Sequence, residues 1–395
     1  MALLSGILIS GCHYAWTPYQ VRIPTEATSV PLELRAGIPI VEVYLNGEGP
    51  YRFLLDTGTA VVAVDKKLAT ELNLSYRRGK QRISDPLGQK EKVQVCRVGS
   101  FLLGESRFEE FDAIVADLEG LQFTPIDGIL GTGLFDQCRL TIDYVNRLVR
   151  VEESGKPPEI ADRPNVLPLR HDRFGLSIPV RYKTMEMWCL IDSGAYYDLY
   201  FERRGIPSLV TLDSEPVLLP SPHESLLGLS TAYAARARDS FFLGQVEIQR
   251  PIVTSTTVNR PNISEKQLRT YLPRLGGRVL NNFAVTIDQK AHVAIFSRNG
   301  QAPIVPPSPS IRYGGLYVER EANGIRLVDG DNPQPFPKTC GLQVGDLIVA
   351  IDGRSTTELS DAEFERLLEE NDTMKLTIHR AGKRIDLECS LIVIK

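Results

Sequence analysis

The sequence of this chain contains an internal repeat. Residues 51–60 (YRFLLDTGTA) and residues 187–196 (MWCLIDSGAY) are both short apolar runs that end in Asp-[Ser/Thr]-Gly. Short apolar runs that end at a glycine turn are typical of buried β-strands and too short for helices. A repeat of this kind constrains the fold strongly, because both copies must adopt the same structure.

Further matches follow in the same order along the chain. They are Leu87-Gly88 with Leu227-Gly228, Ser100–Gly104 with Ser240–Gly244, Leu130-Gly131 with Leu275-Gly276, and Thr141–Asp143 with Thr286–Asp288. The separation between partners grows from 136 residues at the first pair to 145 at the last and never decreases. Two copies of one fold that differ by small loop insertions produce this pattern. We therefore predict two structurally related halves.

Polar, Pro-rich segments divide the chain into its predicted domains. The first half is expected at residues 30–152 and the second at residues 166–297, with a Pro-rich link between them. Residues 297–312 form a second Pro-rich link, which is expected to be extended. Both halves are predicted to be mainly β, and Asn46-Gly47 between two apolar runs predicts a tight hairpin turn.

The repeat makes Asp56 and Asp192 the candidate catalytic residues. A carboxylate at the end of an apolar strand is costly unless neighbours stabilise it. Here the hydroxyl of Thr57 or Ser193 and the amide of the next glycine are available. Either motif alone is equally well explained as an ordinary turn. If equal halves pack about a pseudo-two-fold axis, however, the two Asp residues meet at that axis.

Two carboxyl groups in contact can divide acid and base roles between them. They do not ionise together easily, so one pKa falls, the other rises, and the pair titrates as a unit. The ionised group can take a proton from a bound water, while the protonated group donates to a substrate carbonyl oxygen. This predicts amide hydrolysis by an activated water, with no cofactor and no metal.

At these motifs the chain resembles the bacterial retropepsin-like aspartic peptidases in a single-chain form. The resemblance covers residues 31–296 and includes an apolar-apolar-Gly turn in each half, Ile129-Leu130-Gly131 and Arg274-Leu275-Gly276. The second turn departs from the pattern, because Arg274 stands at an apolar position. The resemblance implies two retropepsin-like β-barrel halves forming a pseudo-dimer. It also implies catalytic roles for the two Asp residues, supported by Thr57, Gly58, Ser193 and Gly194.

The same resemblance implies a β-hairpin flap over the substrate in each half. Position and glycine content place the first flap at residues 84–89, with Pro86, Leu87 and Gly88 at its tip. The second is expected at residues 220–228. The two segments are dissimilar in sequence, so an asymmetric cleft is expected.

The C-terminal segment, residues 313–391, has a pattern of its own. Residues 340–353 (CGLQVGDLIVAIDG) resemble PDZ domains, which are small α+β modules, and Ser360 with Glu363 predicts a capping box at the start of a helix. In PDZ domains a peptide ligand adds as a strand to a sheet edge. The resemblance places the receiving loop and strand at Gly314, Gly315, Leu316, Tyr317 and Val318. A module that only packs against the peptidase is the alternative.

The N-terminus resembles the signal segment of a bacterial lipoprotein. Residues 1–11 (MALLSGILISG) are apolar and precede Cys12, as in a lipobox, although the run is short and contains no Lys or Arg. The resemblance implies lipidation of Cys12 and anchoring to a membrane on the periplasmic or outer side of the cell envelope. An ordinary apolar N-terminus with an incidental cysteine is the alternative.

Several other protein classes are disfavoured by the sequence. The net charge is −4 with no basic stripe, which argues against a nucleic-acid partner. The five His residues are scattered, and no H-E-x-x-H, G-x-S-x-G or phosphate-loop motif is present. Cys96, Cys189 and Cys389 lie in apolar strand patterns and are expected to be buried thiols, with a Cys96–Cys138 bridge left open.

Two functions are consistent with these features. The first is an aspartic endopeptidase that cleaves protein or peptide substrates, with the PDZ-like module recruiting or gating them. The second is a catalytically idle envelope protein that binds peptides in the cleft or at the PDZ edge. Retention of both Asp residues and both neighbouring hydroxyl residues favours the first.

Overall fold

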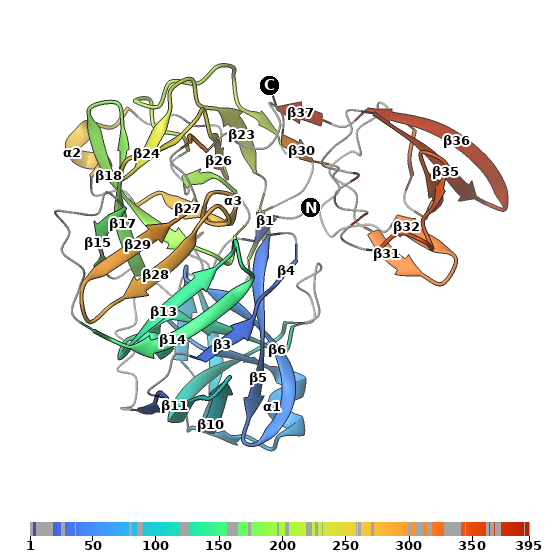
Figure 1. Ribbon diagram of the computed structural model, residues 1–395. Coiled ribbons are helices and arrows are strands. Elements are labelled where there is room, and N and C mark those ends of the chain that lie inside the picture. Colours follow the sequence, from blue (N-terminus) through green and yellow to red (C-terminus); the bar gives the residue numbers. More distant parts are fainter. Residues whose placement is uncertain are drawn as a thin grey trace.

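The structure is a computed structural model and consists mainly of β-strands (Figure 1). The residues that it describes are 3–4, 19–24, 28–35, 37–78, 81–84, 90–118, 126–155, 165–172, 175–195, 197–201, 205–218, 223–225, 228–230, 232–257, 259, 262–269, 272–298, 302–304, 311–313, 318–327, 341–343, 345–360, 363, 367, 373–390 and 392–394. Within these residues, no helix has the length and apolarity needed to cross a membrane.

The first half is built on a ten-stranded sheet with the main order β2-β11-β7-β12-β6-β5-β10-β8. Its strands are β2 (Gln20–Arg22), β4 (Glu33–Arg35), β5 (Ile38–Leu45), β6 (Glu48–Asp56), β7 (Ala63–Asp65), β8 (Ser75–Tyr76), β9 (Gln81–Ser84), β10 (Lys90–Leu103), β11 (Ser106–Ala116) and β12 (Gly128–Gly131). Helix α1 (Lys66–Glu71) follows β7, and the 3-10 helix η1 (Thr132–Phe135) follows β12. The hairpin turn predicted at Asn46-Gly47 joins β5 to β6.

The second half repeats this topology in a second ten-stranded sheet. Its strands are β16 (Arg170–Asp172), β17 (Gly175–Tyr182), β18 (Met185–Asp192), β19 (Leu199–Phe201), β20 (Val217–Leu218), β23 (Tyr233–Arg236), β24 (Phe241–Leu243), β25 (Val246–Ile248), β26 (Ile252–Ser255) and β27 (Arg274–Gly276). In both halves the Asp-bearing strand pairs in parallel with a short later strand, β6 with β12 and β18 with β27. Short helices α2 (Glu265–Leu268) and α3 (Gly277–Leu280) flank β27.

A six-stranded sheet joins the two halves, and Figure 1 shows it between them. Its strands are β3 (Thr28–Pro31), β13 (Cys138–Asp143), β14 (Leu148–Glu153), β15 (Val166–Pro168), β28 (Ala284–Asp288) and β29 (Val293–Ser297). At its centre β13 runs antiparallel to β28, so that Thr141 lies opposite Thr286 with 2.8 Å between the hydroxyl oxygens. These two residues are repeat partners, so the pseudo-two-fold axis passes between them. One hydrophobic core also extends through both halves.

The C-terminal segment forms a separate six-stranded sheet with the main order β31-β32-β33-β35-β36. Its strands are β31 (Val318–Glu321), β32 (Gly324–Leu327), β33 (Leu347–Ile351), β34 (Arg354–Ser355), β35 (Thr373–Arg380) and β36 (Lys383–Ser390). A core of its own includes Ile348 and Leu376. The predicted capping box is present: the Ser360 amide donates to Glu363 Oε2, and the Glu363 amide donates to Ser360 Oγ. In a two-stranded sheet of its own, β30 (Ile311–Tyr313) pairs with β37 (Ile392–Ile394).

The described cysteines are of two kinds. Cys96, Cys138 and Cys189 are free and buried, and burial raises the pKa of the Cys96 and Cys138 thiols to about 12. Cys389 is disulfide-bonded. The expectation of a free thiol at Cys389 was therefore wrong, because an apolar strand pattern predicts burial but carries no information about a covalent partner.

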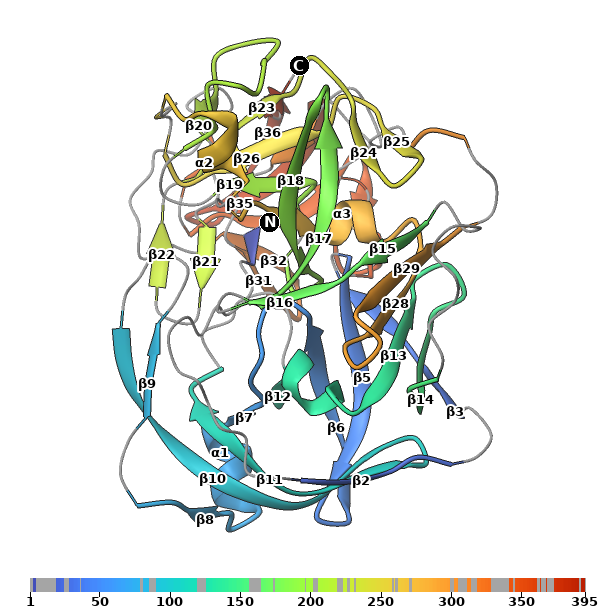
Figure 2. The same ribbon diagram turned by 90° about the vertical axis from the view of Figure 1, so that its left-hand side faces the viewer.

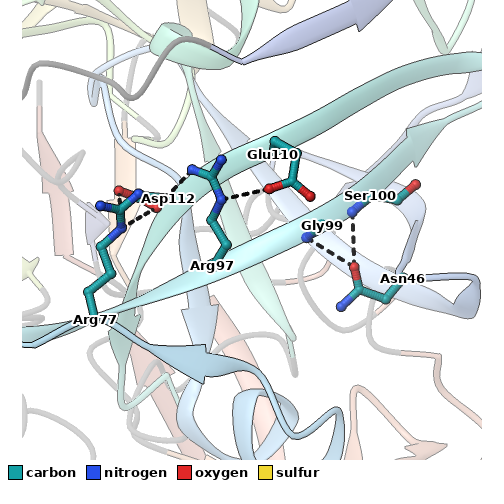
Figure 3. Close-up of polar contacts among 7 residues, drawn as sticks. All are labelled: Asn46, Arg77, Arg97, Gly99, Ser100, Glu110 and Asp112. Atoms are coloured by element: carbon teal, nitrogen blue, oxygen red, sulfur yellow. Dashed lines mark hydrogen bonds and ion pairs between the residues drawn. The ribbon is translucent and has the colours of Figure 1, made fainter.

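The turn between β5 and β6 is tied to a neighbouring strand by the Asn46 side chain (Figure 3). Its Oδ1 accepts hydrogen bonds from the amides of Gly99 and Ser100 in β10, at 3.1 and 2.9 Å. Asn46 has a φ of 52°, in the left-handed region that Asn tolerates better than most residues. The side chain thus sets both the turn conformation and the position of the Asp56-bearing hairpin relative to β10.

Replacing Asn46 with Ala should therefore lower the free energy of unfolding by about 2–4 kcal/mol, from the left-handed backbone and two lost hydrogen bonds. Asn46→Gly keeps the backbone freedom and should lose only the hydrogen-bond part, while Asn46→Asp keeps an acceptor oxygen and should lose least. Urea denaturation of the three variants measures this order. Equal losses in Ala and Asp variants would contradict the role given to the side chain.

Candidate active site

The two Asp-[Ser/Thr]-Gly turns lie at equivalent ends of equivalent strands. Asp56 is the last residue of β6 and pairs with Gly131 of β12, while Asp192 is the last residue of β18 and pairs with Gly276 of β27. Both carboxyl side chains are buried, with 1% and 0% of their surface exposed. In each half, an apolar strand paired with a short strand that ends in glycine thus positions the Asp carboxyl group in the region between the halves.

The carboxyl groups pack against each other's turns. A Cβ atom built on Gly58 would lie 2.6 Å from Oδ1 of Asp192, and one built on Gly194 would lie 2.4 Å from Cγ of Asp56. Such contacts are too short for any residue with a side chain, so glycine is required at both positions. The Gly58 amide also donates to Asp56 Oδ1 at 2.8 Å. The structure therefore brings the two predicted catalytic residues together at the contact between the halves.

Thr57 and Ser193 connect the two turns through four buried hydrogen bonds. The Thr57 amide donates to Ser193 Oγ at 2.8 Å, and the Ser193 amide donates to Thr57 Oγ1 at 2.9 Å. Each hydroxyl then donates to a carbonyl of the opposite strand, Thr57 to Ile191 at 2.9 Å and Ser193 to Leu55 at 2.7 Å. This reciprocal set fixes the separation of the two turns.

Asp192 has additional partners that the repeat did not predict. Its Oδ2 accepts hydrogen bonds from the Tyr197 hydroxyl at 2.6 Å and from Arg274 Nη1 at 2.8 Å. The Arg274 guanidinium is fully buried and lies over the Tyr200 ring at 5.9 Å from its centroid. Tyr197 and Tyr200 stack with their centroids 5.2 Å apart. The Arg in the second apolar-apolar-Gly turn was the available sequence signal for this network.

Two tyrosines near the carboxyl groups remain protonated. Burial raises the pKa of Tyr197 well above its usual value, and the nearby Asp192 raises it further. Burial likewise raises the pKa of Tyr144, together with the charges of Asp192 and Asp56. Tyr197 is therefore a hydroxyl donor at any working pH. Tyr144 immediately follows β13, and nothing in the sequence marked it as a residue near the site except its position after the repeated Thr-Ile-Asp.

Hairpin strands border the first predicted flap and lie partly within the second, residues 220–228 (Figure 2, left). β9 pairs with β10 up to Ser84 opposite Lys90. The predicted tip residues Pro86, Leu87 and Gly88 lie outside the described residues. In the second half β21 (His223–Ser225) pairs with β22 (Gly228–Ser230), and β1 (Leu3–Leu4) runs parallel to β21.

Other predicted sites are only partly described. Gly314, Gly315, Leu316 and Tyr317 of the predicted PDZ peptide site lie outside the described residues, as does Cys12, while Val318 begins β31. Within the described part of the chain, no group of three or more His, Cys, Asp or Glu side chains is arranged to hold a metal ion.

Two family models match segments of this chain. Residues 41–134, which include Asp56 and its turn, match an aspartyl protease model. Residues 338–380 match a PDZ domain model. The chain thus combines a segment similar to aspartyl proteases with a C-terminal PDZ domain, in a mainly β fold.

Solved structures show more distant likeness. A retropepsin-like aspartic protease from Rickettsia conorii is 21% identical over 35% of this chain and 96% of its own, with a TM-score of 0.23. Basic 7S globulin from soybean is 11% identical over 71% of this chain and 96% of its own, with a TM-score of 0.39. These values are too low to support a conclusion about activity. No curated protein matches the chain in sequence.

Proposed function

We propose that this chain is an aspartic endopeptidase in which Asp56 and Asp192 together activate a water molecule for attack on a peptide bond. The observation that supports the proposal best is the placement of each carboxyl group against the glycine of the opposite turn. The cross-axis hydrogen bonds of Thr57 and Ser193 support it as well, because they hold both groups in one geometry.

The proposed reaction needs only the two carboxyl groups and water. The ionised carboxylate takes a proton from the water while the water oxygen attacks the carbonyl carbon of the peptide bond. At the same time the protonated carboxyl group gives its proton to the carbonyl oxygen. The resulting gem-diol collapses when the first group passes its proton to the leaving nitrogen and the second recovers a proton from a diol hydroxyl. Both groups return to their starting states, and no covalent intermediate forms.

Substrate access requires an opening step. Because the two side chains are 1% and 0% exposed, a peptide reaches them only after the groups that cover them move aside. The two predicted flaps are the segments to which we assign this motion. Closure over a bound peptide would then exclude water from the site.

The PDZ domain and the N-terminus extend this proposal. PDZ domains bind peptides by adding a strand to a sheet edge, so we assign the C-terminal domain to recruiting or gating protein substrates. Lipidation of Cys12 would hold the enzyme at a membrane of a bacterial cell envelope. Metabolic labelling with an alkyne fatty acid tests the anchor: the label should be lost in Cys12→Ala.

Cleavage of fluorescently labelled casein by purified protein tests the peptidase proposal. Wild type should release labelled peptides and be inhibited by pepstatin, and Asp56→Asn should be slower by about 10²–10⁴-fold, the usual contribution of a general acid or base. Thr141→Ser, which keeps the hydroxyl of the central sheet pair, is a control that should retain activity. Equal cleavage by wild type and Asp56→Asn would overturn the proposal.

One observation favours the alternative of a catalytically idle peptide-binding protein. Asp192 is fully buried and its Oδ2 is engaged by Arg274, at the position where the first half has the apolar Ile129. Under this alternative the protein would bind peptides with the same affinity in wild type and Asp56→Asn, and neither would cleave casein.

A further inference from the structure

The two halves differ in what lies beneath each carboxyl group. In β12, Ile129 pairs with Leu54, while at the equivalent place in β27, Arg274 pairs with Leu190. Tyr197 likewise follows Asp192 by five residues, where Val61 follows Asp56 in the first half. Two apolar side chains of the first half are thus replaced by two hydrogen-bond donors, one of them charged.

Both donors are directed to the same oxygen of Asp192. Oδ2 accepts from Tyr197 and Arg274, whereas Oδ1 has no hydrogen-bond partner within the described part of the chain. Oδ1 is also the atom nearest to the Cβ position of Gly58, in the turn that carries Asp56. An ionised carboxylate only accepts hydrogen bonds, so two donors on one oxygen match its ionised form.

The charges at this place also balance. Arg274 is fully buried, and an isolated buried guanidinium would be strongly unfavourable, so its charge needs a buried anion beside it. Asp192 is that anion, in an ion pair of 2.8 Å between two side chains that are both 0% exposed. A proton shared by the two carboxyl groups is then better placed on Asp56.

We infer that Arg274 and Tyr197 are positioning residues that give the two carboxyl groups fixed and different roles. The inference rests on the proposed peptidase function. Asp192 is the base and takes the proton of the attacking water through Oδ1. Asp56 is the acid and gives its proton to the carbonyl oxygen, after which the two protons return by the route described above.

Among the residues that the structure describes, charged and titratable groups face Asp192 from both halves. They are Asp56 across the contact, Tyr144 after β13, and Tyr197 with Arg274 on its own half. Both tyrosines stay neutral at the pH of an assay, because burial raises their pKa values. Arg274 is therefore the one cation in this set, and its removal should change how the pair of carboxyl groups responds to pH.

The test is the pH dependence of kcat/KM for labelled casein in wild type, Arg274→Ile and Arg274→Lys. Arg274→Ile places in the second half the residue that the first half has at Ile129. Without the cation, the acidic limb of the profile should move up by about one to three pH units, the usual effect of an arginine on a neighbouring carboxyl pair. Arg274→Lys keeps the positive charge, so its acidic limb should move by less than half as much as that of Arg274→Ile.

Two further variants separate positioning from folding. Tyr197→Phe keeps the charge and removes one donor, so its acidic limb should move in the same direction by less, even if Arg274→Ile does not fold. Arg139→Gln removes a different arginine, which pairs with Asp288 at 3.2 Å in the joining sheet. It should lower stability without moving the limb.

The outcomes distinguish this inference from the proposed function. If wild type cleaves casein, Asp56→Asn does not, and the acidic limb is the same in Arg274→Ile and Tyr197→Phe as in wild type, the fixed roles are overturned while the peptidase remains. If Asp56→Asn cleaves as well as wild type, the peptidase itself is overturned and the fixed roles with it. A limb that moves in Arg274→Ile but stays in Arg139→Gln supports the inference.

Discussion

Asp192→Asn should slow casein cleavage by about 10²–10⁴-fold, as expected for loss of a general acid or base, and should also lower the free energy of unfolding by about 3–5 kcal/mol, the usual cost of removing one partner of a buried ion pair. The buried Arg274 would lose the carboxylate that balances its charge, and an Asn side chain supplies no charge. Asp56→Asn should be as inactive but far less destabilised, since an Asn Oδ1 can still accept from the Gly58 amide. Urea denaturation followed by the fluorescence of Trp188, which lies in β18, compares the two variants.

A control comes from an Arg–Asp pair in the joining sheet, in which the Asp is fully buried and the Arg is partly exposed. Asp288 is 0% exposed and pairs with Arg139 in the joining sheet, away from the carboxyl groups of the site. Asp288→Asn should therefore lose some stability, but less than Asp192→Asn because Arg139 is 23% exposed, while still cleaving casein. If Asp56→Asn and Asp192→Asn had the same free energy of unfolding, the ion pair between Asp192 and Arg274 would make no net contribution to stability.

The features that the sequence predicted well are local or repeated. The Asn46-Gly47 turn and the Ser360–Glu363 capping box depend on residues at most three positions apart, and both are present. The repeat extended this reach. Thr141 and Thr286 are 145 residues apart, yet they meet at the centre of one sheet because equal halves placed about an axis bring equal positions together.

The network beneath Asp192 could not be predicted in the same way. Arg274 stands at an apolar position of a repeated motif, which indicates a local difference but does not name its partner. Its partners come from β18 and from the segment that follows, and only packing of three separate segments brings them together. Side-chain networks of this kind depend on tertiary contacts, which neither strand periodicity nor turn chemistry contains.

Thr57→Ala should lower the free energy of unfolding by about 2–6 kcal/mol, because two buried groups lose their hydrogen-bond partner at roughly 1–3 kcal/mol each. Those groups are the Ser193 amide and the Ile191 carbonyl, both on the opposite half. Because they lie beside the Asp192 turn, casein cleavage should fall as well. Urea denaturation and the cleavage assay, run on the same preparations, measure both effects.

Conservative variants at the same positions show whether the hydroxyls are responsible. Thr57→Ser and Ser193→Thr keep an oxygen at the required place, so they should retain most of the stability and activity that the Ala variants lose. Thr57 and Ser193 form hydrogen bonds to each other, so the stability losses of Thr57→Ala and Ser193→Ala should not be additive. The double variant should lose less free energy of unfolding than the sum of the two single variants. Strict additivity would mean that the two hydroxyls act separately, and the rigid contact proposed between the two turns would have no basis.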